Sequence, residues 1–151
     1  MANPGTQTTN TLITATLWNE LVNDIIAQTA RGFGVVLDGG GATITSDTFI
    51  DVGPIPIACT ISSFTVQAYD CGDLGVDVWK FATASDAAAA SDSIFTAASD
   101  HIIMTCDRYF SYASPVGTMT LEAGDWLRFY VESCEAISKA TIGVRLTQTF
   151  A

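Results

Sequence analysis

From Phe33 onward, short stretches of the chain alternate between apolar and polar side chains, and this alternation is the period of a β-strand. Leu127, Phe129 and Val131 alternate with more polar neighbours, and the segment 142–146 repeats the pattern. Turn-forming residues separate such stretches at 38–41 (DGGG), 70–73 (DCGD) and 122–125 (EAGD). Short strands between frequent turns are typical of antiparallel β-proteins. The sequence therefore predicts a mainly β fold, specifically an antiparallel β-sandwich of jelly-roll type.

Several local features refine this prediction. Ile61 is out of phase with Phe64 and Val66, which predicts a β-bulge near residues 62–63. The stretch 43–51 is expected to hold one short strand, and 101–106 and 108–112 two more around a tight turn. Residues 83–99 are rich in Ala, Ser and Asp, and they predict a long surface loop that can include one helical turn.

The first 32 residues differ from the rest and are predicted to form a separate unit, followed by the β-domain at 33–151. Residues 1–13 are polar and predict either an extended arm that a partner orders or a disordered tail. Residues 14–30 predict a short amphipathic helix, since six apolar residues would line one side of it. These candidate interface residues are Leu17, Trp18, Leu21, Val22, Ile25 and Ile26. The stripe can pack on the chain's own sheet, or on copies of itself around a symmetry axis.

Composition narrows the classes of function. Apolar residues make up 48% of the chain, enough to support a packed core. Sixteen acidic residues against six basic ones give a net charge of −10. This charge disfavours both nucleic acids and anionic membrane surfaces, so neither is an expected partner. The sequence has neither 18 consecutive apolar residues nor a secretory signal, so we expect synthesis in a cytosol and no membrane span.

No catalytic, cofactor-binding or metal-binding motif stands out. His101 is the only histidine, and it is expected to be a partly buried residue at the start of a strand. The aspartates fall mostly in turns, and the spacing of Asp70 and Asp73 is not diagnostic of calcium. The four cysteines form no CxxC pair, and we expect reduced core thiols, with oxidation after cell lysis as the alternative. These are Cys59, Cys71, Cys106 and Cys134.

An aromatic-rich region remains as a candidate binding surface. Tyr109, Phe110 and Tyr112 lie close together in sequence, and Trp126 and Tyr130 follow. Such side chains either pack across neighbouring strands or, when exposed, stack on sugars or enter a protein interface. Both interpretations are open from the sequence.

A series of short motifs resembles a domain found in structural proteins of tailed bacteriophages. The motifs occur in the order DGGG (38–41), PIACTI (56–61), DCGDLGVDVWK (70–80), DSI (92–94) and LEAGDWLRFYVES (121–133). An alternating strand at 140–146 closes the series, and the resemblance spans residues 36–147. Phe64 stands where the family often has Trp, and residues 83–99 are rich in Ala and Asp where the family is usually Pro-rich. The segment 14–26 also resembles the short helix that precedes phage appendage domains.

The resemblance implies a non-enzymatic virion protein, with no catalytic residue to carry over. A tail fibre needs a shaft of repeats, and this chain has none. We therefore expect a capsid cement or decoration protein on the virion surface, a homotrimer whose N-terminal arm clamps the major capsid protein or other virion proteins. The alternative is a tail fibre, baseplate or receptor-binding appendage that contacts a host-surface glycan.

Overall fold

The computed structural model describes residues 30–82, 88–112 and 119–148, and 64% of these residues lie in β-strands. Every strand pairing is antiparallel. The strands are β1 (Ala30–Asp38), β2 (Phe49–Val52), β3 (Cys59–Phe81), β4 (Ile102–Tyr112), β5 (Thr120–Leu121), β6 (Trp126–Glu135) and β7 (Lys139–Gln148). The prediction of a mainly β, antiparallel fold is confirmed. The predicted arm at 1–13 lies outside the described residues, as does the predicted helix up to residue 29.

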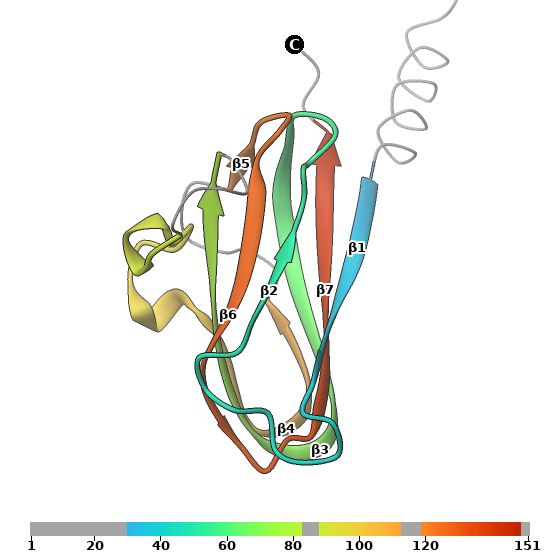
Figure 1. Ribbon diagram of the computed structural model, residues 1–151. Helices are drawn as coiled ribbons and strands as arrows, with labels where there is room; N and C mark the ends of the chain where they lie inside the picture. Colours follow the sequence, from blue (N-terminus) through green and yellow to red (C-terminus); the bar gives the residue numbers. More distant parts are fainter. Residues whose placement is uncertain (1–29, 83–87, 113–118, 149–151) are drawn as a thin grey trace, which may run out of the picture.

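Strand β3 organises the whole sheet because it spans 23 residues and serves two sets of neighbours. Along one edge, its first half pairs with β7 and its second half pairs with β6. Along its other edge, β4 and β5 pair with it. β1 adds outside β7, and β2 adds outside β6, which gives the order β1-β7-β3-β6-β2. The sheet curls until it is nearly closed (Figure 1).

The predicted turn at 70–73 is wrong, because β3 runs through it without a break. Gly72 lies where β3 leaves β7 and meets β6. A Cβ atom at this position would lie 2.2 Å from the carbonyl oxygen of Glu135. The glycine therefore allows two backbones to approach closely, and it does not reverse the chain. The tight turn predicted between 101–106 and 108–112 is wrong for the same reason, since both segments belong to β4.

The core fills the inside of the curled sheet. Leu127, Phe129 and Val131 of β6 are fully buried, as their alternation predicts. The ring of Phe33 on β1 meets the ring of Phe129 edge to face, with centroids 6.3 Å apart. Since β1 and β6 are not neighbours in the sheet, this contact crosses the core.

The connection between β3 and β4 also contributes to the core, so its prediction as a surface loop is wrong in part. This connection contains two single-turn 3-10 helices, η1 (Ala90–Asp92) and η2 (Ala98–Asp100). Between them, Ile94 and Phe95 are buried, and the ring of Phe95 lies 6.0 Å from that of Phe64. Residues 83–87 lie outside the described part of the chain.

Local predictions elsewhere have mixed outcomes. The pairing of β3 with β7 shifts register between Ile61 and Ser63, which confirms the predicted bulge. The DGGG turn is also confirmed, since the N–H of Gly40 donates to Asp38 Oδ1 at 2.8 Å. The strand predicted at 43–51 begins only at Phe49, and the first strand begins at Ala30, three residues earlier than predicted.

Candidate functional site

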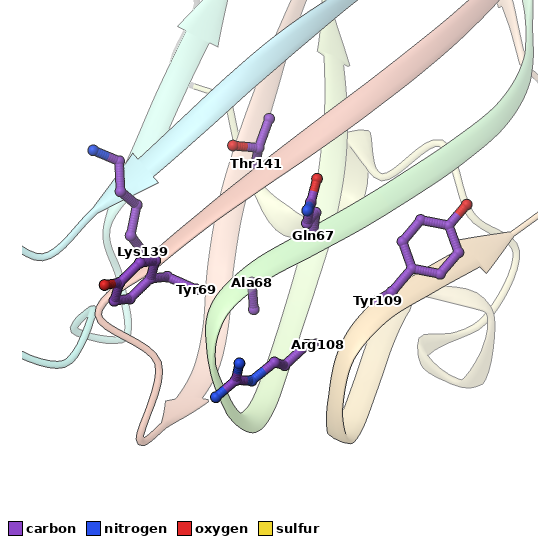
Figure 2. Close-up of a pocket in the computed structure, with 7 residues that line it drawn as sticks. All are labelled: Gln67, Ala68, Tyr69, Arg108, Tyr109, Lys139 and Thr141. Atoms are coloured by element: carbon purple, nitrogen blue, oxygen red, sulfur yellow. The ribbon is translucent and has the colours of Figure 1, made fainter.

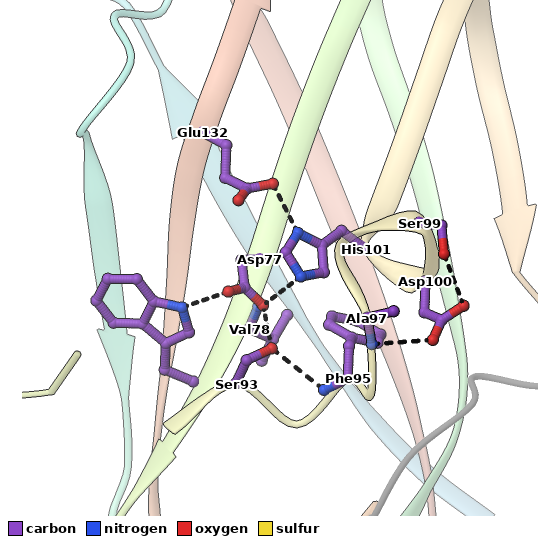
Figure 3. Close-up of polar contacts among 10 residues, drawn as sticks. Asp77, Val78, Ser93, Phe95, Ala97, Ser99, Asp100, His101 and Glu132 are labelled. Atoms are coloured by element: carbon purple, nitrogen blue, oxygen red, sulfur yellow. Dashed lines mark hydrogen bonds and ion pairs between the residues drawn. The ribbon is translucent and has the colours of Figure 1, made fainter. Parts of the chain in front are cut away.

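A buried carboxylate, Asp77, lies at the centre of the most connected polar network among the described residues. Its side chain points away from the core, yet the residue is only 3% exposed because the β3–β4 connection folds over it. Asp77 Oδ1 accepts hydrogen bonds from the Ser93 hydroxyl at 2.6 Å and from the Val78 N–H at 2.7 Å. Asp77 Oδ2 accepts one from Trp79 Nε1–H at 2.6 Å. These bonds offset the cost of burying a charge (Figure 3).

His101 extends this network to β6. Its Nδ1 lies 2.7 Å from Glu132 Oε2, and its Nε2 lies 3.6 Å from Asp77 Oδ1. Because a carboxylate only accepts hydrogen bonds, Nδ1 is assigned the proton, and the Nδ1–H donates a hydrogen bond to Glu132. The buried ring also lies 5.4 Å from that of Phe95. The predicted position is confirmed, since His101 directly precedes β4, but the residue is buried and not partly buried. We call Asp77, Trp79, Ser93, His101 and Glu132 the Asp77 network.

Ser93, Asp77 and His101 are the residue types of a hydrolytic triad, but they meet in the wrong order. In such a triad the histidine accepts the proton of the serine, and the carboxylate orients the histidine. Here the Ser93 hydroxyl donates to Asp77, and within the described residues no hydrogen bond joins Ser93 to His101. The arrangement therefore differs from a triad at its serine.

Asp77, His101 and Glu132 also place one potential metal ligand each within 4.8 Å of one another. A cation at this place would compete with the three donors that already bind Asp77 and with the hydrogen bond between His101 and Glu132. The hydrogen bonds present fit a structural network better than a metal centre. Asp70 and Asp73 serve similar structural ends, since Asp70 binds Ser138 and Asp73 binds the N–H of Cys106.

Stacked aromatic side chains continue this network across β6. Trp79 stacks on Tyr130, with centroids 4.5 Å apart and the rings 21° from parallel. The guanidinium of Arg128 lies over the Phe49 ring and binds both carboxylate oxygens of Asp51, at 2.7 and 2.8 Å. The hydrogen bonds to Asp51 raise the pKa of Arg128. This face of β3, β6 and β2 is therefore held together by its own side chains.

Tyr109, in contrast, is exposed, as one of the two interpretations of the aromatic-rich region requires. It is 60% exposed and borders a groove of about 470 Å³ between β4, β3 and β7. The groove is lined by Gln67, Ala68, Tyr69, Arg108, Tyr109, Lys139 and Thr141 (Figure 2). Trp126 and Tyr130 lie on β6 in the stacked layer, so the five aromatic residues do not form one patch.

The other predicted binding residues fall outside what the structure describes. Phe110 and Tyr112 lie in β4, but their side chains are not among the described ones. The six residues of the predicted apolar stripe, Leu17, Trp18, Leu21, Val22, Ile25 and Ile26, all precede the first described residue. Tyr69, which was not among the predicted binding residues, is 75% exposed and lines the same groove as Tyr109, which we call the Tyr109 groove. Tyr69 was overlooked because it directly precedes the turn that the sequence predicted at 70–73.

The four cysteines are free thiols in the structure, but their predicted core placement holds for one residue only. Cys59 is buried, Cys134 is partly buried, and Cys71 and Cys106 are exposed. Burial raises the pKa of the Cys59 thiol, which makes it a weak nucleophile.

No protein-family model matches this chain, and no curated protein matches it either. Within the described residues, no helix is long and apolar enough to span a membrane. A functional proposal therefore depends on the motifs and contacts described above.

Proposed function

We propose that this chain is a non-enzymatic structural protein of a tailed-bacteriophage virion, and specifically a capsid cement or decoration protein. Its body would be a β-sandwich of jelly-roll type. Its N-terminal residues would clamp neighbouring subunits of the major capsid protein, and the protein would be a homotrimer on the virion surface.

The observation that carries this proposal is that three of the phage-like motifs meet in space. DCGDLGVDVWK lies in β3, DSI lies in the connection, and LEAGDWLRFYVES runs into β6. Asp77 of the first motif binds Ser93 of the second, and Trp79 stacks on Tyr130 of the third. The backbone of Ile94 in the second motif also donates to Val78 in the first. Motifs that hold one another together are typical of a structural fold signature, which supports the resemblance.

The chemistry of the motif residues supports a structural role over an enzymatic one. The Ser93 hydroxyl donates to Asp77 and not to His101, to which it would donate in a triad, and the Arg128 cation of the stacked layer pairs with Asp51. A decoration protein needs a rigid body that survives outside the cell, and a buried network of satisfied hydrogen bonds gives such rigidity. The net charge of −10 would also keep decorated particles apart in solution.

The decoration proposal predicts a high copy number in purified particles. Quantitative mass spectrometry should find this chain at the same order of abundance as the major capsid protein. A chain lacking residues 1–29 should fold, because β1 begins at Ala30, but it should not bind bare capsids. The double variant Trp18→Ala, Leu21→Ala tests the same interaction without removing any residue, and it should also weaken binding to bare capsids. A truncated chain that still saturates bare capsids would contradict the clamp.

A tail appendage that contacts host-surface carbohydrate is the second candidate function. The exposed tyrosines Tyr69 and Tyr109 on one groove favour it. A handful of copies per particle would support this candidate and contradict decoration. Absence from particles would contradict both.

A further inference from the structure

The outer face of the sheet formed by β1, β7 and β3 carries two grooves, exposed tyrosines and basic side chains, although the molecule as a whole is acidic. The Tyr109 groove lies on it, and a second groove of about 730 Å³ follows along the same strands. Three glycines, Gly32, Gly34 and Gly143, are among the residues that line the second groove. We call this region the tyrosine face and define it by Tyr69, Arg108, Tyr109, Lys139, Gly143 and Arg145.

Strand register explains why the two grooves are continuous. Lys139, Thr141, Gly143 and Arg145 alternate with the buried residues of β7, so they share its outer side. Gln67 pairs with Thr141 on one side and with Tyr109 on the other, and it lies between the two tyrosines (Figure 2). From Lys139 to Arg145 the face extends about 20 Å by the usual strand rise. That length suits a short linear polymer.

Positive charge is concentrated on this face. Arg108, Lys139 and Arg145 belong to it, whereas the other two cations with described side chains, Lys80 and Arg128, pair with Asp125 and Asp51 elsewhere. Lys139 pairs with Asp38 at 2.8 Å, with both side chains about half exposed. Arg108 and Arg145 form no ion pair with any residue in the described ranges. Hydrogen bonds lower the pKa of the Asp70 carboxyl and the nearby Arg108 contributes to this shift, but in these ranges neither guanidinium is held in an ion pair that an anionic ligand would have to break.

We propose that the tyrosine face binds an acidic polysaccharide. The rings of Tyr69 and Tyr109 would stack on the C–H faces of sugar rings. Arg108 and Arg145 would bind carboxylates of the polymer, and Gln67 and Thr141 would bind hydroxyls. In the second groove the polar side chains of Ser63 and Thr65 lie beside the glycines and would bind further hydroxyls.

The charge of the whole protein selects among polyanions. A duplex nucleic acid carries one charge per about 1.7 Å, so the net charge of −10 opposes it along its whole length. An acidic polysaccharide carries at most about one carboxylate on each sugar, so its charges are more widely spaced. The negative charge of the protein therefore repels it less strongly. At physiological ionic strength the Debye length is about 8 Å, so the local cations dominate the interaction with each carboxylate.

The test is a binding titration of the full chain with four acidic polysaccharides: hyaluronan, polygalacturonate, alginate and polysialic acid. We expect at least one to bind, with affinity falling as salt rises. Tyr69→Ala and Tyr109→Ala should each weaken binding about three- to tenfold, because each removes one stacking ring. Arg108→Glu should abolish binding, since it repels the carboxylate that the arginine attracts.

Two controls distinguish binding at this site from non-specific binding. Phe49→Ala removes another exposed aromatic ring, but from the β2 side of the molecule, and it should leave affinity unchanged. The carboxyl-reduced, neutral form of the bound polymer should bind much more weakly. Failure of all four polymers, or equal binding of the neutral form, overturns the proposal. Preference for a duplex oligonucleotide would overturn it too. None of these outcomes bears on particle copy number, so the virion proposal is tested separately.

A separate observation concerns Cys71 and Cys106, which meet where β3 and β4 pair irregularly. The Cys71 thiol donates to the carbonyl oxygen of Cys106 at 3.1 Å, and both residues are exposed. The N–H of Cys106 donates to Asp73 Oδ1 at 2.8 Å, which fixes its backbone at a φ of 53°. Charge on the Cys71 sulfur is the largest cause that raises the pKa of the Cys106 thiol, as expected for two neighbouring sulfurs.

We infer that Cys71 and Cys106 form a disulfide when the protein meets an oxidised low-molecular-weight disulfide. The Cys71 thiolate attacks the small disulfide and releases one small thiol, leaving a mixed disulfide on Cys71. This step removes the negative charge beside Cys106. The Cys106 thiolate then attacks the Cys71 sulfur and releases the second small thiol. The two protein thiols lose two protons and two electrons, and the small disulfide is reduced to two thiols.

Incubation of the folded protein with glutathione disulfide tests this inference. We expect a mass loss of two hydrogens, a cross-linked peptide pair containing Cys71 and Cys106, and a melting temperature higher by about 5–10 °C. Cys71→Ser should abolish the cross-link and the shift, and Cys134→Ser should retain both. Stable glutathione adducts in place of the cross-link would overturn the inference.

Discussion

Replacing Asp77 with alanine is expected to lower the free energy of unfolding by about 3–5 kcal/mol. The substitution removes the acceptor for Ser93, Trp79 and the Val78 N–H, and it leaves all three donors without their partner. It also removes the carboxylate beside the Nε2 of His101. Urea denaturation followed by tryptophan fluorescence measures the loss as a lower midpoint at an unchanged slope.

Two further variants make this prediction specific. Asp77→Asn keeps the shape of the side chain and one acceptor oxygen, so it should cost about half as much. Asp107→Ala is the matched control, because Asp107 is exposed and accepts no hydrogen bond within the described residues. A loss below about 1 kcal/mol for Asp77→Ala would show that the network does not stabilise the connection over β3.

Replacing Gly72 with alanine is expected to lower the free energy of unfolding by about 3 kcal/mol. The new Cβ would lie 2.2 Å from the carbonyl oxygen of Glu135 and 3.0 Å from the Ile137 side chain. Since the first obstacle is backbone, β3 and β6 must separate at the point where β3 changes neighbours. Chemical denaturation again provides the measurement.

Gly34→Ala is the matched control for Gly72→Ala, since it makes the same chemical change in another strand. Its Cβ would meet only the Thr141 methyl at 3.8 Å and the Ile142 carbonyl oxygen at 4.0 Å, which are ordinary contacts. Alanine also restricts the unfolded chain, so this variant should be neutral or slightly stabilising. Equal losses for the two variants would mean that glycine acts through strand entropy, and the close approach at Gly72 would not matter.

Local patterns predicted the local parts of the fold. Alternation along 127–131 and 142–146 identified the inward faces of β6 and β7, and the phase slip at Ile61 identified the bulge. The DGGG turn was predictable because positive φ values favour glycine, and Gly40 and Gly41 adopt them. In each case the cause lies within a few residues of the effect.

The failures have causes that are distant in sequence. Gly72 is required by Glu135, which lies on another strand, so composition alone made 70–73 resemble a turn. Ile94 and Phe95 enter the core although Ala, Ser and Asp surround them. The Asp77 network joins residues that are 16 and 31 positions apart, as in Asp77–Ser93 and His101–Glu132. Single-sequence reasoning has no signal for such pairs. It did identify Tyr109 as a candidate surface residue, but not its neighbour Tyr69.

The pairing of β1 with β7 has a mechanical consequence. Ala30 pairs with Thr147, so the chain enters β1 and leaves β7 at the same end of the sheet. Tension between these two points would peel β1 away one residue pair at a time. The force acts along the hydrogen bonds between the two strands, and it loads only the pair nearest the pulled end. A ladder loaded along its strands would instead share the force among all its bonds. The body therefore unzips under tension between Ala30 and Thr147.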